Sequence, residues 1–125
     1  MHVLDASAVV ELLAGRVDLR QLGADRLVAP HLIDSELLSA LRRLERTQRI
    51  SAATARQSLA GFGRLALTRH PVDWLLPRIW ELRHKLTSYD ATYVALTEAL
   101  EATSLLTADE RLAQATGVRC AIELI

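Results

Sequence analysis

Val3-Leu4-Asp5-Ala6-Ser7-Ala8, near the start of the 125-residue chain, joins a short apolar run to a helical segment through an aspartate. The mostly apolar, β-like segment 2–4 predicts a buried strand, and residues 6–13 carry apolar side chains at helical spacing. An acid directly after a buried strand is uncommon unless it is paired or bound to a cation. This junction therefore predicts a strand followed by a helix, with Asp5 in a position that requires a partner.

Strand-like and helical segments alternate along the rest of the chain. The apolar spacing predicts strands over residues 26–29, 65–67, 104–107 and 118–124, and helices over residues 31–49, 52–59, 74–85, 88–102 and 109–115, with a short helical turn at 18–23. Gly61 and Gly63 are expected to end the second of these helices, and Asp73 to cap the third. Strands separated by helices predict a parallel sheet with helices on both faces. We therefore expect an α/β fold with three α/β/α layers, in one domain spanning residues 1–125.

The composition excludes several classes of protein. Half of the residues are hydrophobic and 24% are charged, which is typical of a globular protein and not of a disordered one. Positive and negative residues balance, so binding to nucleic acid would depend on a local basic patch. No run suits a signal peptide or a membrane span, and we expect a cytoplasmic protein.

Other catalytic and binding motifs are missing from the sequence. Cys120 is the only cysteine, lies in the expected last strand, and is interpreted as a small buried hydrophobe. The four histidines lack zinc-ligand spacing, and neither a glycine-rich phosphate loop nor a Ser-His-Asp or Cys-His arrangement is recognisable. A haloacid-dehalogenase-type phosphatase would need an aspartate where Ser7 stands. Trp74 and Trp80 are expected to pack in the core, although exposed parts would suit an interface.

Four carboxylates lie at ends of predicted strands or early in predicted helices: Asp5, Glu36, Asp90 and Asp109. Taken singly, Asp109 could cap a helix, Asp90 could interact with a helix dipole, and Glu36 could be solvated. An α/β sheet nevertheless brings such positions together at one edge, where crowded carboxylates need a cation. Oxygen ligands suit Mg²⁺ or Mn²⁺, which can activate water against a phosphodiester.

Two further groups of residues could support such a site. Ser7 and Thr107 each lie two residues from one of these aspartates, and could hold a carboxylate or a metal-bound water, or serve as a helix cap and a strand residue. Arg42, Arg46 and Arg49, with Arg43 beside them, follow helical spacing on one predicted face. They could contact RNA phosphates or form a solvated helix face.

The four acids, their order and their neighbours resemble the PIN-domain family, and most closely the VapC ribonuclease toxins of bacterial toxin–antitoxin pairs. The stretches that carry the resemblance are Leu4-Asp5-Ala6-Ser7-Ala8, Glu36 leading into Leu41-Arg42-Arg43, Leu86-Thr87-Ser88-Tyr89-Asp90-Ala91, and Leu106-Thr107-Ala108-Asp109-Glu110-Arg111-Leu112. The resemblance implies a parallel sheet flanked by helices, with an acidic pocket that binds Mg²⁺ or Mn²⁺. It assigns Asp5, Glu36, Asp90 and Asp109 as metal-binding, catalytic carboxylates and Thr107 as a supporting hydroxyl. Ser88 departs from the alanine often found at its position.

The resemblance also implies an activity and partners. It predicts a Mg²⁺- or Mn²⁺-dependent endoribonuclease that hydrolyses RNA phosphodiester bonds and is inhibited by a cognate VapB-like antitoxin. A homodimer, or a heteromer with the antitoxin, is expected, without membrane association. Two alternatives remain open: a PIN nuclease outside any toxin pair, and a PIN-fold module that binds RNA or protein without catalysis.

Overall fold

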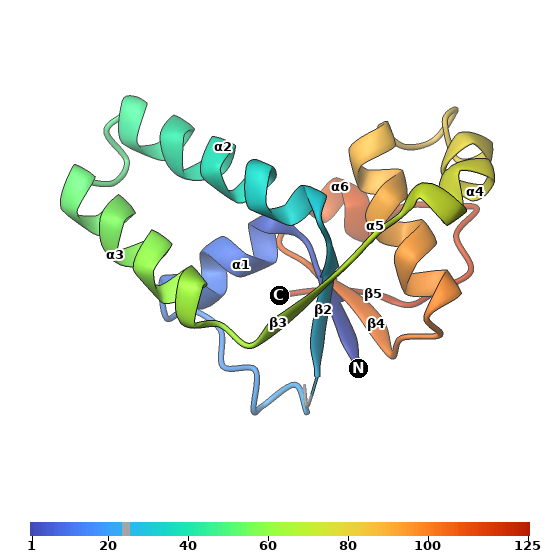
Figure 1. Cartoon of the computed structure of the whole chain (residues 1–125), viewed down its shortest axis with the longest axis horizontal. Coiled ribbons are helices and arrows are strands. Elements are labelled where there is room, and N and C mark those ends of the chain that lie inside the picture. Colours follow the sequence, from blue (N-terminus) through green and yellow to red (C-terminus); the bar gives the residue numbers. More distant parts are fainter. Residues whose placement is uncertain (24–25) are drawn as a thin grey trace.

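The computed structural model describes residues 1–23 and 26–125 and contains one sheet of five parallel strands (Figure 1). The strands run in the order β3-β2-β1-β4-β5, with bounds β1 (His2–Leu4), β2 (Leu27–Pro30), β3 (Leu67–His70), β4 (Ser104–Thr107) and β5 (Ile122–Leu124). The direction of the strand order reverses between β1 and β4. Ligands of open α/β sheets bind beside such a reversal, at the carboxyl ends of the strands.

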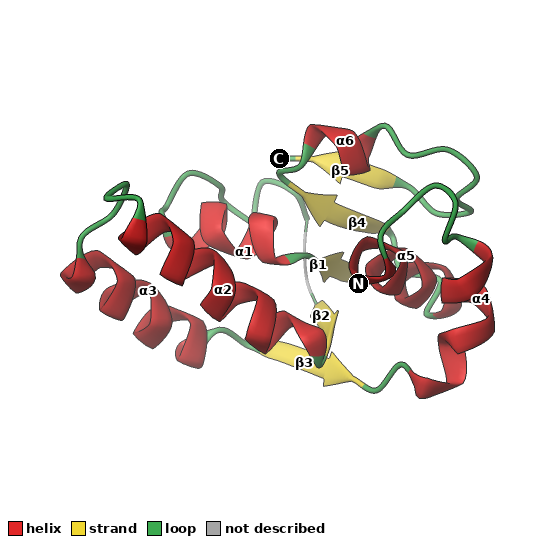
Figure 2. Ribbon diagram, turned by 90° about the horizontal axis from the view of Figure 1, so that it is seen from above, coloured by secondary structure: helices red, strands yellow, loops and turns green. Residues whose placement is uncertain are grey.

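Helices cover both faces of this sheet. Figures 1 and 2 show α1 (Ala6–Leu13), α2 (Leu32–Arg46) and α3 (Ala52–Arg64) on one side, and the 3₁₀ helix η1 (Asp73–Leu75), α4 (Leu76–Glu81) and α5 (Ser88–Ala99) on the other. The short helix α6 (Glu110–Ala113) packs against β4 and β5. The arrangement is the three-layer α/β/α fold that the sequence predicts. No helix in the described ranges is both long and apolar enough to cross a membrane.

The core lies around the two central strands. Val3 and Leu4 of β1 and Leu105 and Leu106 of β4 have no solvent exposure. Helix α5 contacts β1, β2 and β4 and is also covered by α4, which is why every residue from 91 to 97 is buried. The loops that follow β1 and β4 therefore start from fully buried strand residues.

Side-chain caps begin four of the helices. Asp5 caps α1 by accepting from the Ala8 N–H (2.8 Å), and Ser51 and Thr87 cap α3 and α5 in the same way. Asp109 caps α6 and accepts from the Arg111 N–H. A cap of this kind typically stabilises a helix by about 1 kcal/mol. Two of the four candidate acids are thus positioned by helix caps.

The predicted end of the helix over residues 52–59 is wrong. Helix α3 continues through Gly61 and Gly63 to Arg64. Phe62, between the two glycines, is buried in the core, and Gly61 lies close to Leu13 of α1. This packing outweighs the intrinsic cost of about 1 kcal/mol for each helical glycine.

The segment around the tryptophans also differs from the prediction. Instead of one helix over residues 74–85, η1 is followed by the short helix α4, and Val72 rather than Asp73 occupies the N-cap position of η1. Trp74 and Trp80 are 55% and 67% exposed, so neither is a core residue. The segment carries more apolar side chains than its contact with α5 can cover, so some of them stay exposed.

Several other boundaries move by a few residues. Helices α2 and α5 end at Arg46 and Ala99, earlier than predicted, because Gln48 and Glu101 just beyond them have positive φ angles. Strands β2 and β3 lie one to three residues later than predicted, in the register that pairs Leu27 with Leu67.

The C-terminal elements are shorter than predicted, and residues 18–23 form hydrogen-bonded turns rather than a helix. Helix α6 ends at Ala113. Strand β5 occupies the sheet edge, as expected, but begins only at Ile122. Cys120 therefore lies outside the strand and is half-buried, and its partial burial raises the pKa of the thiol to about 11.

Candidate active site

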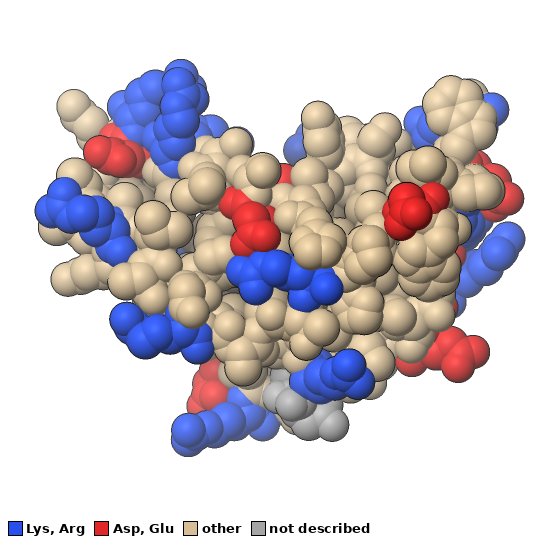
Figure 3. Space-filling view, in the orientation of Figure 1, with Lys and Arg blue, Asp and Glu red and all other residues tan. Residues whose placement is uncertain are grey.

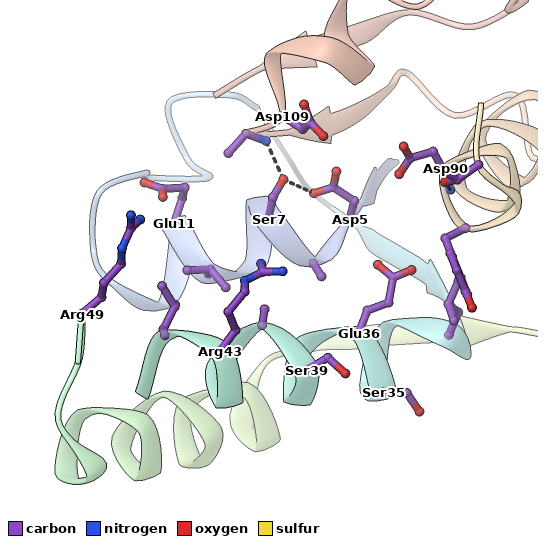
Figure 4. A pocket seen from close by; sticks show the side chains of 18 residues that line it. Asp5, Ser7, Glu11, Ser35, Glu36, Ser39, Arg43, Arg49, Asp90 and Asp109 are labelled. Carbon is purple, nitrogen blue, oxygen red and sulfur yellow. Dashed lines mark hydrogen bonds between the residues drawn. The ribbon is translucent and has the colours of Figure 1, made fainter. Parts of the chain in front are cut away.

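Four carboxylates from four elements line one open pocket of about 970 Å³ at the carboxyl edge of the sheet. Asp5 follows β1 and Asp109 follows β4, while Glu36 lies in the second turn of α2 and Asp90 in the first turn of α5. Their side chains face a common space (Figure 4). The structure thus brings together all four acids that the sequence singles out.

Asp5 is the most firmly held of the four. Its Oδ1 accepts hydrogen bonds from Ser7 Oγ (2.7 Å) and the Ala8 N–H (2.8 Å), and its Oδ2 accepts one from Thr107 Oγ1. Figure 4 shows the Ser7 contact at the start of α1. Three donors fix the orientation of this carboxylate.

The same two hydroxyls connect the loops after β1 and β4. Ser7 Oγ accepts from the Ala108 N–H (2.8 Å), and Thr107 Oγ1 accepts from the Asp109 N–H (3.0 Å). Each hydroxyl therefore donates to Asp5 and accepts from the backbone beside Asp109. This network sets the position of one aspartate relative to the other.

The environment opposes ionisation of three of the carboxylates. Burial raises the pKa of Asp5 despite the hydrogen bonds that favour its charged form. Burial, followed by the charges of Asp90 and Asp5, raises the pKa of Glu36 from 4.5 to about 7. The pKa of Asp90 is raised in the same way, by burial and then by the charges of Asp109 and Asp5. Burial and mutual repulsion therefore oppose the simultaneous ionisation of these acids near neutral pH.

Glu36 has spare hydrogen-bonding capacity inside the protein. Its Oε2 accepts from the Tyr93 hydroxyl (3.4 Å), but its Oε1 is buried and finds no hydrogen-bond partner among the described residues. Tyr93 is fully buried, and its burial and the nearby carboxylates raise the pKa of the phenol, so the hydroxyl stays protonated and can donate. Tyr93 is not among the site residues that the sequence predicts, although it lies on α5 three residues after Asp90.

The donor set suits a hard divalent cation. Apart from Arg111, which lies 3.8 Å from Asp109, none of the four acids forms an ion pair within residues 1–23 and 26–125. Over the same residues, no three Asp, Glu, His or Cys side chains converge on a single ion position. Mg²⁺ commonly binds one or two carboxylates directly and keeps several waters, so convergence of more ligands is not required. A bound cation would give the Oε1 of Glu36 a partner and would lower the raised pKa values of the acids.

Comparison with known proteins adds to this geometry. The sequence model of the PIN-domain family matches residues 2–118 of the chain. The chain belongs to the PIN-domain family. Ribonuclease VapC9 of Mycobacterium tuberculosis is 48% identical to this PIN domain over 126 residues, covering 100% of this chain and 98% of the relative. Ribonuclease VapC1 of the same species is 44% identical over 129 residues, covering 98% and 96%.

Solved structures agree on the fold. The crystal structure of PAE2754 from Pyrobaculum aerophilum matches this PIN domain with a TM-score of 0.72 and 28% identity, covering 97% of this chain and 81% of that one. Mycobacterium tuberculosis VapC20 matches with a TM-score of 0.64, covering 95% and 97%. Because the identity to VapC20 is only 17%, that likeness concerns the fold alone.

The arginines of the PIN domain are distributed differently from the predicted ridge. Arg49 lies beyond the end of α2, so it does not share a helix face with Arg42 and Arg46. Arg42 lines a separate groove between α2 and α3, whereas Arg43 and Arg49 line the acidic pocket (Figure 4). The sequence could have placed Arg43 beside the acids, because a spacing of seven residues puts it on the same helix face as Glu36.

Proposed function

We propose that this PIN domain is a divalent-metal-dependent endoribonuclease of the VapC type. The observation that carries the proposal is the pocket in which Asp5, Glu36, Asp90 and Asp109 meet beside the reversal of strand order. The names of its full-length relatives support RNA as the substrate. The raised pKa values of three of these acids favour a bound cation in the working state.

The protein's own groups would hold the site in shape. A carboxylate oxygen can accept more than one hydrogen bond, so Asp5 keeps lone pairs for a cation while its three donors prevent it from turning away. Glu36, Asp90 and Asp109 supply oxygens from the other walls of the pocket. When bound, Mg²⁺ or Mn²⁺ would lower the pKa of a water and stabilise charge on the phosphodiester.

The test is cleavage of RNA by the purified protein with Mg²⁺ or Mn²⁺. Asp90→Asn should lower the cleavage rate at least about 100-fold, through loss of transition-state stabilisation, while the circular dichroism spectrum stays unchanged. Asp73→Asn is the matched control, because Asp73 is exposed and does not line the pocket. Full activity of Asp90→Asn, or cleavage in excess EDTA, would overturn the proposal. A wild-type protein that binds RNA but cleaves none would instead support a binding module.

We further propose that a VapB-like antitoxin inhibits this PIN domain and that the active form in the cytoplasm is a homodimer. Similarity to VapC proteins over the whole chain supports the pairing. Co-expression with the product of a short neighbouring reading frame should yield a stable complex without ribonuclease activity. Light scattering of the isolated protein should report twice the chain mass. Failure to form the complex would favour a PIN nuclease outside any toxin pair.

A further inference from the structure

Charged side chains of both signs line the pocket along its length. Asp5, Glu36, Asp90 and Asp109 lie towards one end, Arg49 and Glu11 lie at the other end, and Arg43 lies between the two groups (Figure 4). We propose that these two arginines bind backbone phosphates of single-stranded RNA that flank the scissile bond. This inference rests on the proposed function, because it assumes that RNA is the substrate of the acidic end.

Helix α2 connects the two ends of the pocket. Its residues Leu32, Ser35, Glu36, Ser39, Ala40 and Arg43 all line the pocket, which is the spacing of one helix face. The small side chains of Ser39 and Ala40 leave the floor open between Glu36 and Arg43. Seven residues correspond to about 10 Å along a helix. This distance spans about three stacked nucleotides of one strand, so Arg43 can reach a phosphate near the reacting one.

Neither arginine is used by the fold. Within the described residues, Arg43 and Arg49 form no hydrogen bond or ion pair from their side chains, whereas Arg69 and Arg78 bind Asp34 and Glu98. Both unpaired arginines are exposed, so their removal should not affect packing. Their guanidinium groups are therefore available to a ligand.

Glu11, which lines the same end of the pocket as Arg49, is already paired with another residue. Figure 4 shows Glu11 close to Arg49, but Arg16 binds both oxygens of Glu11, at 2.6 and 2.9 Å. That contact lowers the pKa of Glu11 and satisfies its charge. Among the described residues Arg49 therefore has no ion pair, and its guanidinium is available at this end of the pocket.

The groove continues past Arg49. The same arginine also lines a second hollow of about 720 Å³, with Thr54, Gln57 and Ser58 of α3 on its wall. The wall of this hollow is mixed, because it also includes apolar side chains such as Leu41, Leu44 and Ile50. Its guanidinium, hydroxyl and amide groups can still hydrogen-bond a phosphate backbone that passes over it. Figure 3 shows Lys and Arg gathered over the far end of α2 and the start of α3. Arg42 and Arg46 belong to this end of α2 but do not line the pocket, so they serve as the comparison for Arg43 and Arg49.

Physical chemistry favours RNA as the occupant. The whole chain carries no net charge, so a polyanion gains nothing from the molecule as a whole. The four carboxylates repel phosphates unless cations lie nearby. A planar guanidinium binds a phosphate through two hydrogen bonds, which gives orientation as well as attraction. Arg43 and Arg49 offset the acidic end and align the strand across it.

The test measures binding without cleavage. A fluorescently labelled single-stranded oligouridine is titrated with protein in EDTA, and anisotropy gives the affinity between about 50 and 200 mM salt. The double variant Arg43→Gln, Arg49→Gln should bind about tenfold more weakly, and the slope of log affinity against log salt should fall by about 1.4. The matched control is Arg42→Gln, Arg46→Gln, which removes the same charge from the same region but outside the pocket. This control variant should change the RNA affinity and the salt slope several-fold less than the pocket variant does.

These binding measurements test the role of Arg43 and Arg49 independently of RNA cleavage. Equal losses in the two double variants, an unchanged salt slope, or no binding by the wild type would overturn the inference. So would normal RNA affinity of the pocket variant combined with loss of binding to an acidic protein partner. If wild type cleaves RNA and the pocket variant binds it normally, only this inference fails. If no RNA is cleaved but the arginine dependence holds, only the proposed catalysis fails.

Discussion

Replacement of Glu36 by Gln should stabilise the metal-free protein at high pH and not at low pH. Glutamine has the same shape and can still accept from the Tyr93 hydroxyl, but it cannot ionise. The folded protein raises the pKa of Glu36 from 4.5 to about 7, through burial and then the charges of Asp90 and Asp5. Between these two values the folded state holds a proton that the unfolded state has lost. The native state is therefore penalised progressively as pH rises, and fully above about pH 7.

The size of the penalty follows from the shift. At 1.36 kcal/mol for each pKa unit, the upper limit is about 3 kcal/mol. Glu36 is partly solvated, so screening by water reduces this limit, and we expect about 1–2 kcal/mol. For a chain of this size, each kcal/mol corresponds to about 4 °C in melting temperature.

Urea unfolding of wild type and Glu36→Gln in EDTA, at about pH 5 and about pH 8, provides the measurement. Any fixed cost of burying an amide is the same at both values, so the informative quantity is the change in the difference between them. Glu45→Gln, in an exposed part of the same helix, is the control and should show no such change. An equal difference at both pH values would refute the idea that burial and neighbouring acids hold the proton on Glu36.

Three further results are expected. Addition of Mn²⁺ at about 100 times its dissociation constant should stabilise the wild type by about 2.7 kcal/mol near pH 8, and Asp90→Asn by much less; thermal melts without such a shift would contradict a shared cation site. Thr107→Val, which removes the donor to Asp5 and the acceptor of the Asp109 N–H, should cost about 1–3 kcal/mol in urea unfolding and reduce RNA cleavage, while Thr107→Ser keeps both. Gly63→Ala should raise the unfolding free energy by up to about 1 kcal/mol, because the position is helical with open space around it, whereas Gly15→Ala should lower it because Gly15 has a φ of +71°.

Local patterns in the sequence were sufficient for the architecture and for the four acids. A strand that is buried on both faces is a continuous apolar run, as in Val3-Leu4 and Leu105-Leu106, and the polar residue that follows marks its end. Parallel strands joined by helices place those ends at one edge of the sheet, so the sequence alone predicts that Asp5 and Asp109 lie close together. Caps such as Ser51 and Thr87 are equally local. Metal binding and catalysis by the acids remain predictions for the experiments above.

The features that only the tertiary structure decided depend on residues distant in sequence. Helix α3 runs through two glycines because Phe62 is held in the core, and Trp74 and Trp80 are exposed because only part of their segment contacts α5. The hydrogen bond from Thr107 to Asp5 joins positions 102 residues apart. The direction in which each arginine points depends on where α2 ends and how α1 and α3 pack beside it. Propensity and periodicity describe one segment at a time, whereas packing free energy depends on which segments meet, and only the folded chain determines that.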